Sequence, residues 1–143
     1  MQEQLLQKLQ TYISDNNPDL LIQLQEENRL TQYLHEKLAS VAEEIDQMQE
    51  DGAPAYVIED ICLDTLTANL RPSRFNYICT ILQEDFEPTY NQWKESGTLT
   101  YEAINLLNAC EALFEVVHFS SESENNPALK AEVKEIIRQY INE

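Results

Sequence analysis

The hydrophobic residues of this chain recur with the period of an α-helix, and this periodicity limits the folds that the chain can adopt. In the most regular stripe, successive members are three or four positions apart: Leu30, Leu34, Leu38, Val41, Ile45 and Met48. Such steps place side chains on one face of a helix, whereas a half-buried strand requires strict alternation. The stripe predicts one long helix that ends near Asp51 and Gly52.

Similar stripes predict further helices along most of the chain. Several of them begin at residues that favour a helix start: Asn17-Pro18, Pro54, Ser73, Thr98 or Thr100, and Asn126-Pro127. The matching NNPDL (16–20) and NNPAL (125–129) are interpreted as one start signal used twice. Residues 87–97 are predicted to be a connector, and residues 98–104 are the nearest approach to a strand, although they also suit a helix start.

The chain length and the scarcity of glycine support the same fold. A chain of 143 residues has the size of one ordinary domain. Only two glycines are present, which argues against a site built from flexible loops. We therefore expect an all-α protein: a single compact multihelical domain of about six helices over residues 1–143.

The charge balance disfavours two classes of partner. Nine basic residues face 26 acidic ones, and the formal net charge is −17. Nucleic-acid phosphates and anionic membrane surfaces are bound by Lys and Arg, so direct binding to either is not expected. No apolar run reaches the roughly 18 residues that a membrane-spanning helix requires.

The cysteines and the N-terminal segment indicate the compartment. Cys62, Cys79 and Cys110 form neither a CxxC motif nor an even set, and each lies among apolar helical neighbours. We interpret them as small buried hydrophobic residues. The segment MQEQLLQKLQ does not resemble a signal peptide. A cytoplasmic location is therefore expected.

No catalytic motif is present, and one pair of residues is a weak candidate for metal binding. The sequence lacks GxGxxG, P-loop, GxSxG and HExxH motifs. Glu115 and His118 have the Glu-x-x-His spacing that carboxylate-bridged di-iron bundles use twice. The other histidine, His35, follows Gln32 at that spacing, so half of the motif is missing. We expect no cofactor and no metal.

A run of acidic residues is the strongest indication of function. No Lys or Arg occurs between Leu38 and Leu70, a window that spans two predicted helices. Its candidate partner-binding residues are Glu43, Glu44, Asp46, Glu50, Glu59, Asp60 and Asp64. An acidic face of this kind steers basic partners toward it, whereas the simpler interpretation is that the charges keep the protein soluble.

The only tryptophan, Trp93, is a possible anchor for a partner. It lies in the predicted connector near Tyr90. Buried aromatic residues often dominate binding energy at interfaces. The alternative is that the two rings fill a gap between helices.

Three segments resemble an uncharacterised helical family that occurs mainly in Bacteroidetes, the domain of unknown function numbered eighteen ninety-six. They are LLQKLQTYISDNNPDL near the start, FNYICTILQEDFEP (75–88), and the stretch from LLNACEALFEVV (106–117) through NNPALKAEVKEIIRQYINE. Where this family has a Gly-Leu-His/Tyr-Phe-Ser stretch, this chain has NLRPSRFN (69–76). The resemblance implies a helical fold and an accessory role, and it assigns no catalytic or binding residue.

These features favour a non-enzymatic protein that acts by contact with other proteins. The expected partner is a basic protein surface, or a second copy of the chain. The first alternative is an acidic DNA mimic that inhibits a nucleic-acid-binding protein. The second alternative is a metalloenzyme that uses Glu115 and His118.

Overall fold

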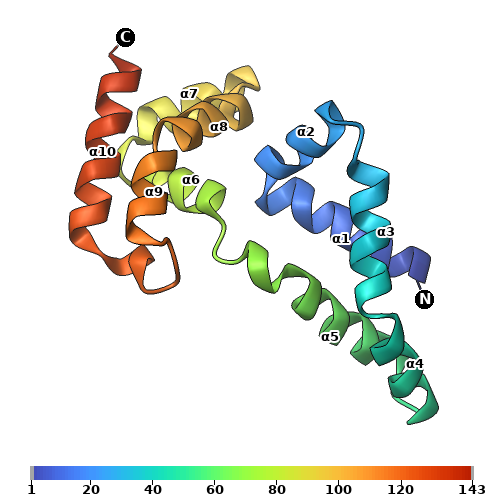
Figure 1. Cartoon of the computed structure of the whole chain (residues 1–143). Helices are drawn as coiled ribbons and strands as arrows, with labels where there is room; N and C mark the ends of the chain where they lie inside the picture. Colours follow the sequence, from blue (N-terminus) through green and yellow to red (C-terminus); the bar gives the residue numbers. More distant parts are fainter. Residues whose placement is uncertain (1, 143) are drawn as a thin grey trace. The chain divides into compact units, whose positions relative to one another are not determined.

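The computed structural model describes residues 2–142, and it is helical (Figure 1). These residues form ten α-helices and two short 3-10 helices, and no strand occurs among them. The all-α prediction is confirmed. Residues 98–104, the nearest candidate for a strand, lie at the start of a helix. The chain divides into two compact units, residues 1–70 and 71–143. The expectation of a single domain over residues 1–143 stays a prediction.

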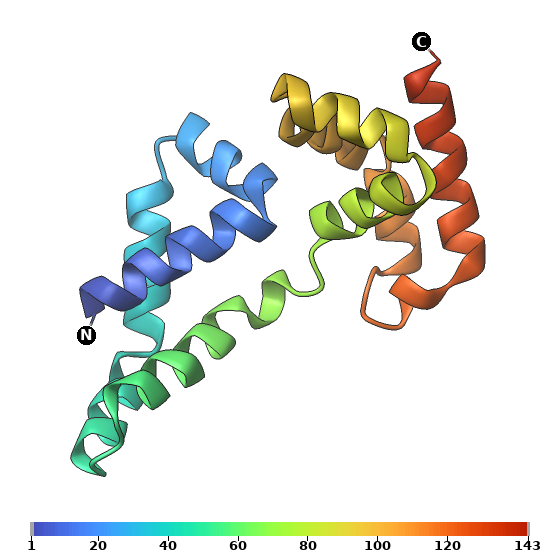
Figure 2. The same cartoon turned by 180° about the vertical axis from the view of Figure 1, so that it is seen from behind.

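Unit 1 consists of five α-helices and a closing 3-10 turn. They are α1 (Gln2–Asn16), α2 (Pro18–Glu26), α3 (Leu30–Ser40), α4 (Ala42–Glu50), α5 (Ala55–Thr67) and η1 (Ala68–Leu70). Helix α1 packs against α2, α3 and α5, and α4 lies beside α5 (Figures 1 and 2). The core is drawn from this unit alone: Leu5, Leu9, Ile13, Leu34, Leu38, Val41, Ile45, Ile58, Cys62 and Leu66.

Unit 2 also consists of five α-helices and one short 3-10 helix. Its elements are α6 (Arg74–Asp85), α7 (Glu87–Ser96), α8 (Leu99–Ala109), α9 (Glu111–Val117), η2 (Ser123–Asn125) and α10 (Pro127–Ile141). Helix α8 contacts α6, α7, α9 and α10. Its buried core also comes from this unit alone: Phe75, Tyr77, Ile78, Ile81, Leu82, Ala103, Leu106, Leu107, Cys110, Phe114, Leu129, Val133 and Ile137.

The expected number of about six helices is wrong, because two predicted helices are each broken at one buried residue. Val41 separates α3 from α4 with φ −113° and ψ 7°, and Cys110 separates α8 from α9 with φ −95° and ψ 0°. Both residues are at most 2% exposed, so the apolar stripe continues through the break. The hydrophobic periodicity of the sequence therefore does not reveal such a break. In addition, residues 87–96 form helix α7 in place of the predicted connector, and Pro18–Glu26 form a separate short helix, α2.

The predicted helix starts are confirmed at two positions by hydrogen bonds from backbone N–H groups to capping side chains. The Ser73 hydroxyl accepts a hydrogen bond from the Asn76 backbone N–H at 3.0 Å. The Asn126 side-chain oxygen accepts from the backbone N–H groups of Ala128 and Leu129 at 2.9 and 3.3 Å. These bonds satisfy N–H groups that have no partner within the helix. Thr98 precedes α8 as expected, without a side-chain capping bond.

Over residues 2–142, none of the helices is both long enough and apolar enough to cross a bilayer.

Candidate functional site

Six of the seven predicted acidic residues lie exposed on helices α4 and α5. These two helices pack against each other within unit 1. We call this surface the acidic face and define it by its exposed carboxylates: Glu43, Glu44, Asp46, Glu50, Asp60 and Asp64. Because water screens exposed charges only partly at short range, neighbouring carboxylates together produce a negative potential over this surface.

Glu59 does not belong to the acidic face, and the expectation that it is exposed is wrong. Glu59 is 7% exposed, and its carboxylate accepts a hydrogen bond from the Lys8 ammonium at 2.5 Å. This bond raises the pKa of Lys8, and the lowering effect of burial is smaller. Lys8 lies on α1, 51 positions away, so the charge pattern of the acidic window does not reveal the pair.

Two exposed apolar side chains accompany the acidic face on α5. Tyr56 is 68% exposed and Ile61 is 49% exposed. Tyr56 and Asp60 are four positions apart, which places them on one side of the helix. On this helix the structure buries Ile58 and Cys62 and exposes Ile61. Apolar side chains among carboxylates supply contact area that charges alone do not.

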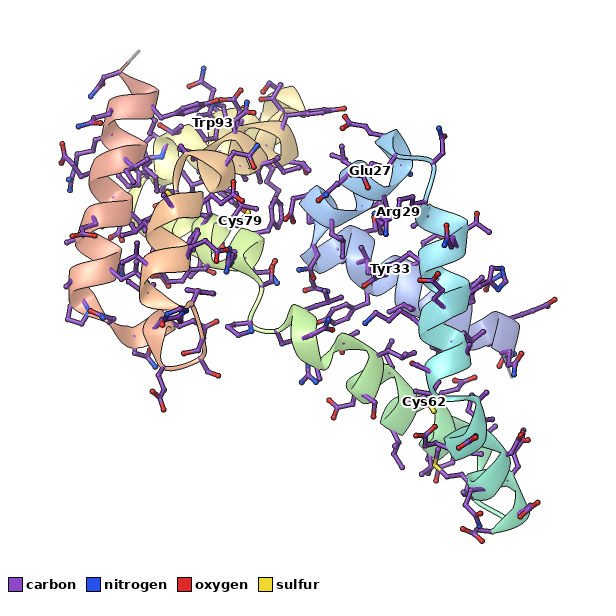
Figure 3. The ribbon with its side chains drawn as sticks, viewed as in Figure 1. Glu27, Arg29, Tyr33, Cys62, Cys79 and Trp93 are labelled. Atoms are coloured by element: carbon purple, nitrogen blue, oxygen red, sulfur yellow. The ribbon has the colours of Figure 1, made fainter. Side chains whose placement is uncertain are left out.

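Trp93 packs within unit 2 (Figure 3). It lies on α7, half-buried, and its ring meets the Tyr140 ring of α10 edge to face at a centroid distance of 6.2 Å. Tyr140 in turn donates a hydrogen bond to the Glu102 carboxylate at 2.8 Å. Trp93 therefore joins α7 to α10, and its role as an anchor for a partner stays a prediction.

Glu115 and His118 do not share a helical face. Helix α9 ends at Val117, and His118 follows in the left-handed region with φ 50°. Glu115 forms an ion pair with Arg74 at 3.1 Å. Among the described residues, no three His, Cys, Asp or Glu side chains are placed to hold a metal ion together. The geometry expected of this pair is therefore wrong, because the helix stops one residue before the histidine.

The three cysteines are free thiols in apolar surroundings, as the sequence predicted. Cys62 and Cys110 are buried, and Cys79 is half-buried. Burial raises the pKa of Cys79 and of Cys110 to about 11 each, and it also raises the pKa of Cys62. The reactive form of cysteine is the thiolate, so these groups are poor nucleophiles at neutral pH.

We expect Cys79 and Cys110 to resist alkylation in the folded protein. A rise in pKa from 9.0 to about 11 lowers the thiolate population roughly 100-fold at a given lower pH. Iodoacetamide at pH 8 should therefore label these residues at least about 100-fold more slowly than in urea, where both are exposed. Mass spectrometry of timed digests measures both rates. Rapid labelling of Cys110 without urea would contradict this placement.

Two open surface clefts, lined mostly by polar residues, were not indicated by the sequence. One, of 680 Å³, lies in unit 1 along α1 and α5 and is lined in part by Gln7, Lys8 and Glu59. The other, of 360 Å³, lies in unit 2 between α6, η2 and α10 and is lined in part by Tyr77 and Lys130. In each unit the lining comes from helices far apart in the sequence, which explains why no local motif predicted it.

Comparison with known proteins adds no functional assignment. No family model, no curated protein and no solved structure matches the chain. Membership of the helical family that the sequence resembles stays a prediction.

Proposed function

We propose that this protein is a non-enzymatic interaction module whose acidic face binds a basic surface of another protein. The observation that carries this proposal is the exposure of six carboxylates on two adjacent helices in a segment without Lys or Arg. Glu43, Glu44, Asp46 and Glu50 form no ion pair within residues 2–142. Their charges are therefore available to a partner.

The exposed Tyr56 and Ile61 support a protein partner over a purely electrostatic role. A surface that only maintains solubility gains nothing from exposed apolar side chains beside its carboxylates. Aromatic residues within a charged rim are typical of protein interfaces. A partner that presents Lys or Arg around an apolar patch would match both features of this face.

Charge reversal on α4 tests the proposal. Partners of the immobilised protein are eluted by increasing salt and identified, and the Kd of the most salt-sensitive partner is measured. We expect the combined variant E43K/E44K/D46K/E50K to weaken binding at least about 10-fold, since complementary charge sets encounter and specificity. The matched control reverses four exposed acids on other helices of the same unit: Glu3, Asp15, Glu26 and Glu36. If both variants bind as the unmodified protein does, the acidic face is not the binding surface.

A competition arm separates the DNA-mimic alternative from the main proposal. If the acidic face imitates DNA, a duplex of about 20 base pairs should compete for the same partner, because phosphates and carboxylates would occupy one basic surface. If the duplex has no effect at concentrations that bind the partner, mimicry is excluded for that partner. The proposal of a basic protein surface stands in either case when charge reversal weakens binding.

A further inference from the structure

The two units repeat one pattern of buried positions. A shift of 69 residues places the buried residues of α3 and α4 on those of α8 and α9. The corresponding pairs are Leu34 and Ala103, Leu38 and Leu107, Val41 and Cys110, and Ile45 and Phe114. The same shift places Leu9 of α1 on Ile78 of α6, and Ile13 on Leu82. All of these positions are buried, so both units use one arrangement of core-facing residues.

The turns between the helices repeat at the same shift. The Arg29 N–H donates to the Leu24 carbonyl at 2.8 Å after α2, and the Thr98 N–H donates to the Trp93 carbonyl at 2.9 Å after α7. The residues just before the two donors, Asn28 and Gly97, both have positive φ, 56° and 76°. Only Gly and, less readily, Asn adopt this conformation at low cost. Two turns with the same hydrogen bonds and backbone hand point to one structural unit used twice.

The last helices correspond at a shift of 71, because the loop before α10 is longer. Ile58, Cys62 and Leu66 of α5 then match Leu129, Val133 and Ile137 of α10, all buried. The chain therefore contains one five-helix unit in two copies.

The fourth helix of the unit presents a different surface in each copy. The exposed acids of α4 are Glu43, Glu44, Asp46 and Glu50. At the shift of 69, only Asp46 has an acid at the corresponding position of unit 2, and that acid is Glu115, which is exposed as well. The surroundings of Glu115 therefore show how the unit uses a carboxylate at this position.

In unit 2 this carboxylate holds a guanidinium group. The Arg74 guanidinium donates a hydrogen bond to the Glu115 carboxylate at 3.1 Å and lies 5.5 Å from the centroid of the Phe114 ring. Arginine makes both contacts at once because its planar group donates from its edge while its face lies against a ring. By comparison, Lys8 contacts a carboxylate and Lys37 contacts an aromatic ring.

Unit 1 has no arginine at the corresponding place. The residue that corresponds to Arg74 is Leu5, which is 0% exposed and belongs to the hydrophobic core. Asp46, the counterpart of Glu115, forms no ion pair within residues 2–142. The acidic face therefore lacks the cation that unit 2 supplies from its own chain.

The acidic face also has an exposed ring beside a carboxylate. Tyr56 is 68% exposed, and the exposed Asp60 lies one turn further along the same side of α5. Asp60 forms no ion pair within the described part of the chain. Its charge contributes to the raised pKa of Lys8, but the Lys8 ammonium is bound to Glu59. A ring and a carboxylate are the two groups that hold the arginine of unit 2.

We propose that the acidic face binds arginine side chains of its partner and prefers arginine to lysine. One guanidinium would lie on the Tyr56 ring and donate to the Asp60 carboxylate, and Asp46 would accept from another as Glu115 accepts from Arg74. This inference rests on the proposed function, because it names the chemistry of the basic surface that the proposed function requires.

The test is a nuclear magnetic resonance titration of the full chain with three capped heptapeptides. Each peptide has three copies of arginine, of lysine or of the neutral citrulline, separated by pairs of glycines. We expect the arginine peptide to shift the amide signals of Asp46, Tyr56 and Asp60 saturably, and to bind at least about 3-fold more tightly than the lysine peptide. The citrulline peptide should leave these signals in place. Equal affinity for arginine and lysine would overturn the proposal.

The variant Tyr56→Leu assigns the preference to the ring. It keeps an apolar side chain but removes the aromatic face, so the Kd of the arginine peptide should rise about 2- to 5-fold, more than that of the lysine peptide. A purely electrostatic surface would keep the ratio of the two Kd values unchanged, and that result would contradict the proposal. Tyr101→Leu is the matched control, because Tyr101 of unit 2 is 67% exposed, and it should leave both Kd values unchanged.

The variant Asp60→Asn assigns the hydrogen bond to the carboxylate. It should raise the Kd of the arginine peptide at least about 3-fold, because a charge-assisted bond is lost. Asp15→Asn on α1 is the control, since it removes one exposed acid of the same unit and changes the net charge equally. The arginine peptide should bind this control as it binds the unmodified protein. Equal weakening in both variants would mean that only the net charge matters, which contradicts the proposal.

This inference and the proposed function can fail separately. If the arginine and lysine peptides bind equally and both are lost on charge reversal of α4, the proposed function stands and the preference for arginine is wrong. If neither cationic peptide shifts the signals of α4 and α5, or if charge reversal leaves their binding unchanged, the result contradicts both.

Discussion

Replacing Phe114 with alanine is expected to lower the free energy of unfolding of unit 2 by about 3–5 kcal/mol. The Phe114 ring is 0% exposed. It meets the Tyr77 and Phe119 rings edge to face at centroid distances of 5.9 and 5.0 Å. Truncation removes these contacts and leaves a cavity that the short helices around it close only in part. A unit of this size has a stability of roughly 4–11 kcal/mol, so the loss takes a large share of it.

The matched control is Ile45→Ala, at the corresponding position of unit 1. Trp93, the only tryptophan, reports on unit 2 by fluorescence during urea unfolding. Phe114→Ala should move this fluorescence transition to a much lower urea concentration. Ile45→Ala should leave the fluorescence transition in place and lower only the urea midpoint of unit 1, followed by circular dichroism. The reason is that each hydrophobic core draws its residues from one unit. Equal shifts of the fluorescence transition in the two variants would show that the units unfold together.

Much of the helical structure was predictable because local rules determine it. The stripe of α1, the capping by Ser73 and Asn126, and the Pro54 start of α5 depend on residues within one or two turns of each other. Capping residues and helical periodicity act at this range. The burial of Cys62 and Cys110 followed from the same patterns, whereas Cys79, also expected to be buried, is only half-buried.

The breaks and the ion pairs depend on packing and were not predictable in this way. Val41 and Cys110 keep their place in the apolar stripe while the backbone turns at them, so the period of the sequence stays intact. Lys8 meets Glu59 only because α1 packs on α5. Six of the seven acids chosen from the acidic window are exposed as expected, and Glu59 is buried.

The sequence pattern did not reveal the repeat of the five-helix unit, for a related reason. The most similar strings, NNPDL and NNPAL, mark noncorresponding positions, because Pro18 begins the second helix of unit 1 and Pro127 begins the fifth helix of unit 2. They are one start signal used twice, as the sequence suggested. The true correspondence preserves burial and turn geometry but changes residue identity, as between Val41 and Cys110 or Asn28 and Gly97.

The second large effect is expected from Glu59→Lys. This substitution places a second ammonium against Lys8 at a position that is 7% exposed, where Asp60 is the remaining carboxylate that acts on Lys8. Removing the buried acid of this part-buried pair and adding a like charge both destabilise the fold. The urea midpoint of unit 1, followed by circular dichroism, should fall at least as far as in Ile45→Ala. Asp60→Lys on the adjacent exposed position is the control, and it should change stability by no more than about 0.5 kcal/mol.

The double variant Lys8→Glu with Glu59→Lys should recover most of this loss. It reproduces in unit 1 the polarity that unit 2 already has, where Lys130 on the last helix pairs with Asp85 on the first. Only the position on the last helix corresponds, because Glu59 matches Lys130, whereas Lys8 matches Tyr77 and Asp85 matches Asn16. The double variant therefore tests whether an acid at position 8 pairs with a lysine at position 59. A double variant that is no more stable than Glu59→Lys alone would mean that unit 1 requires its own polarity.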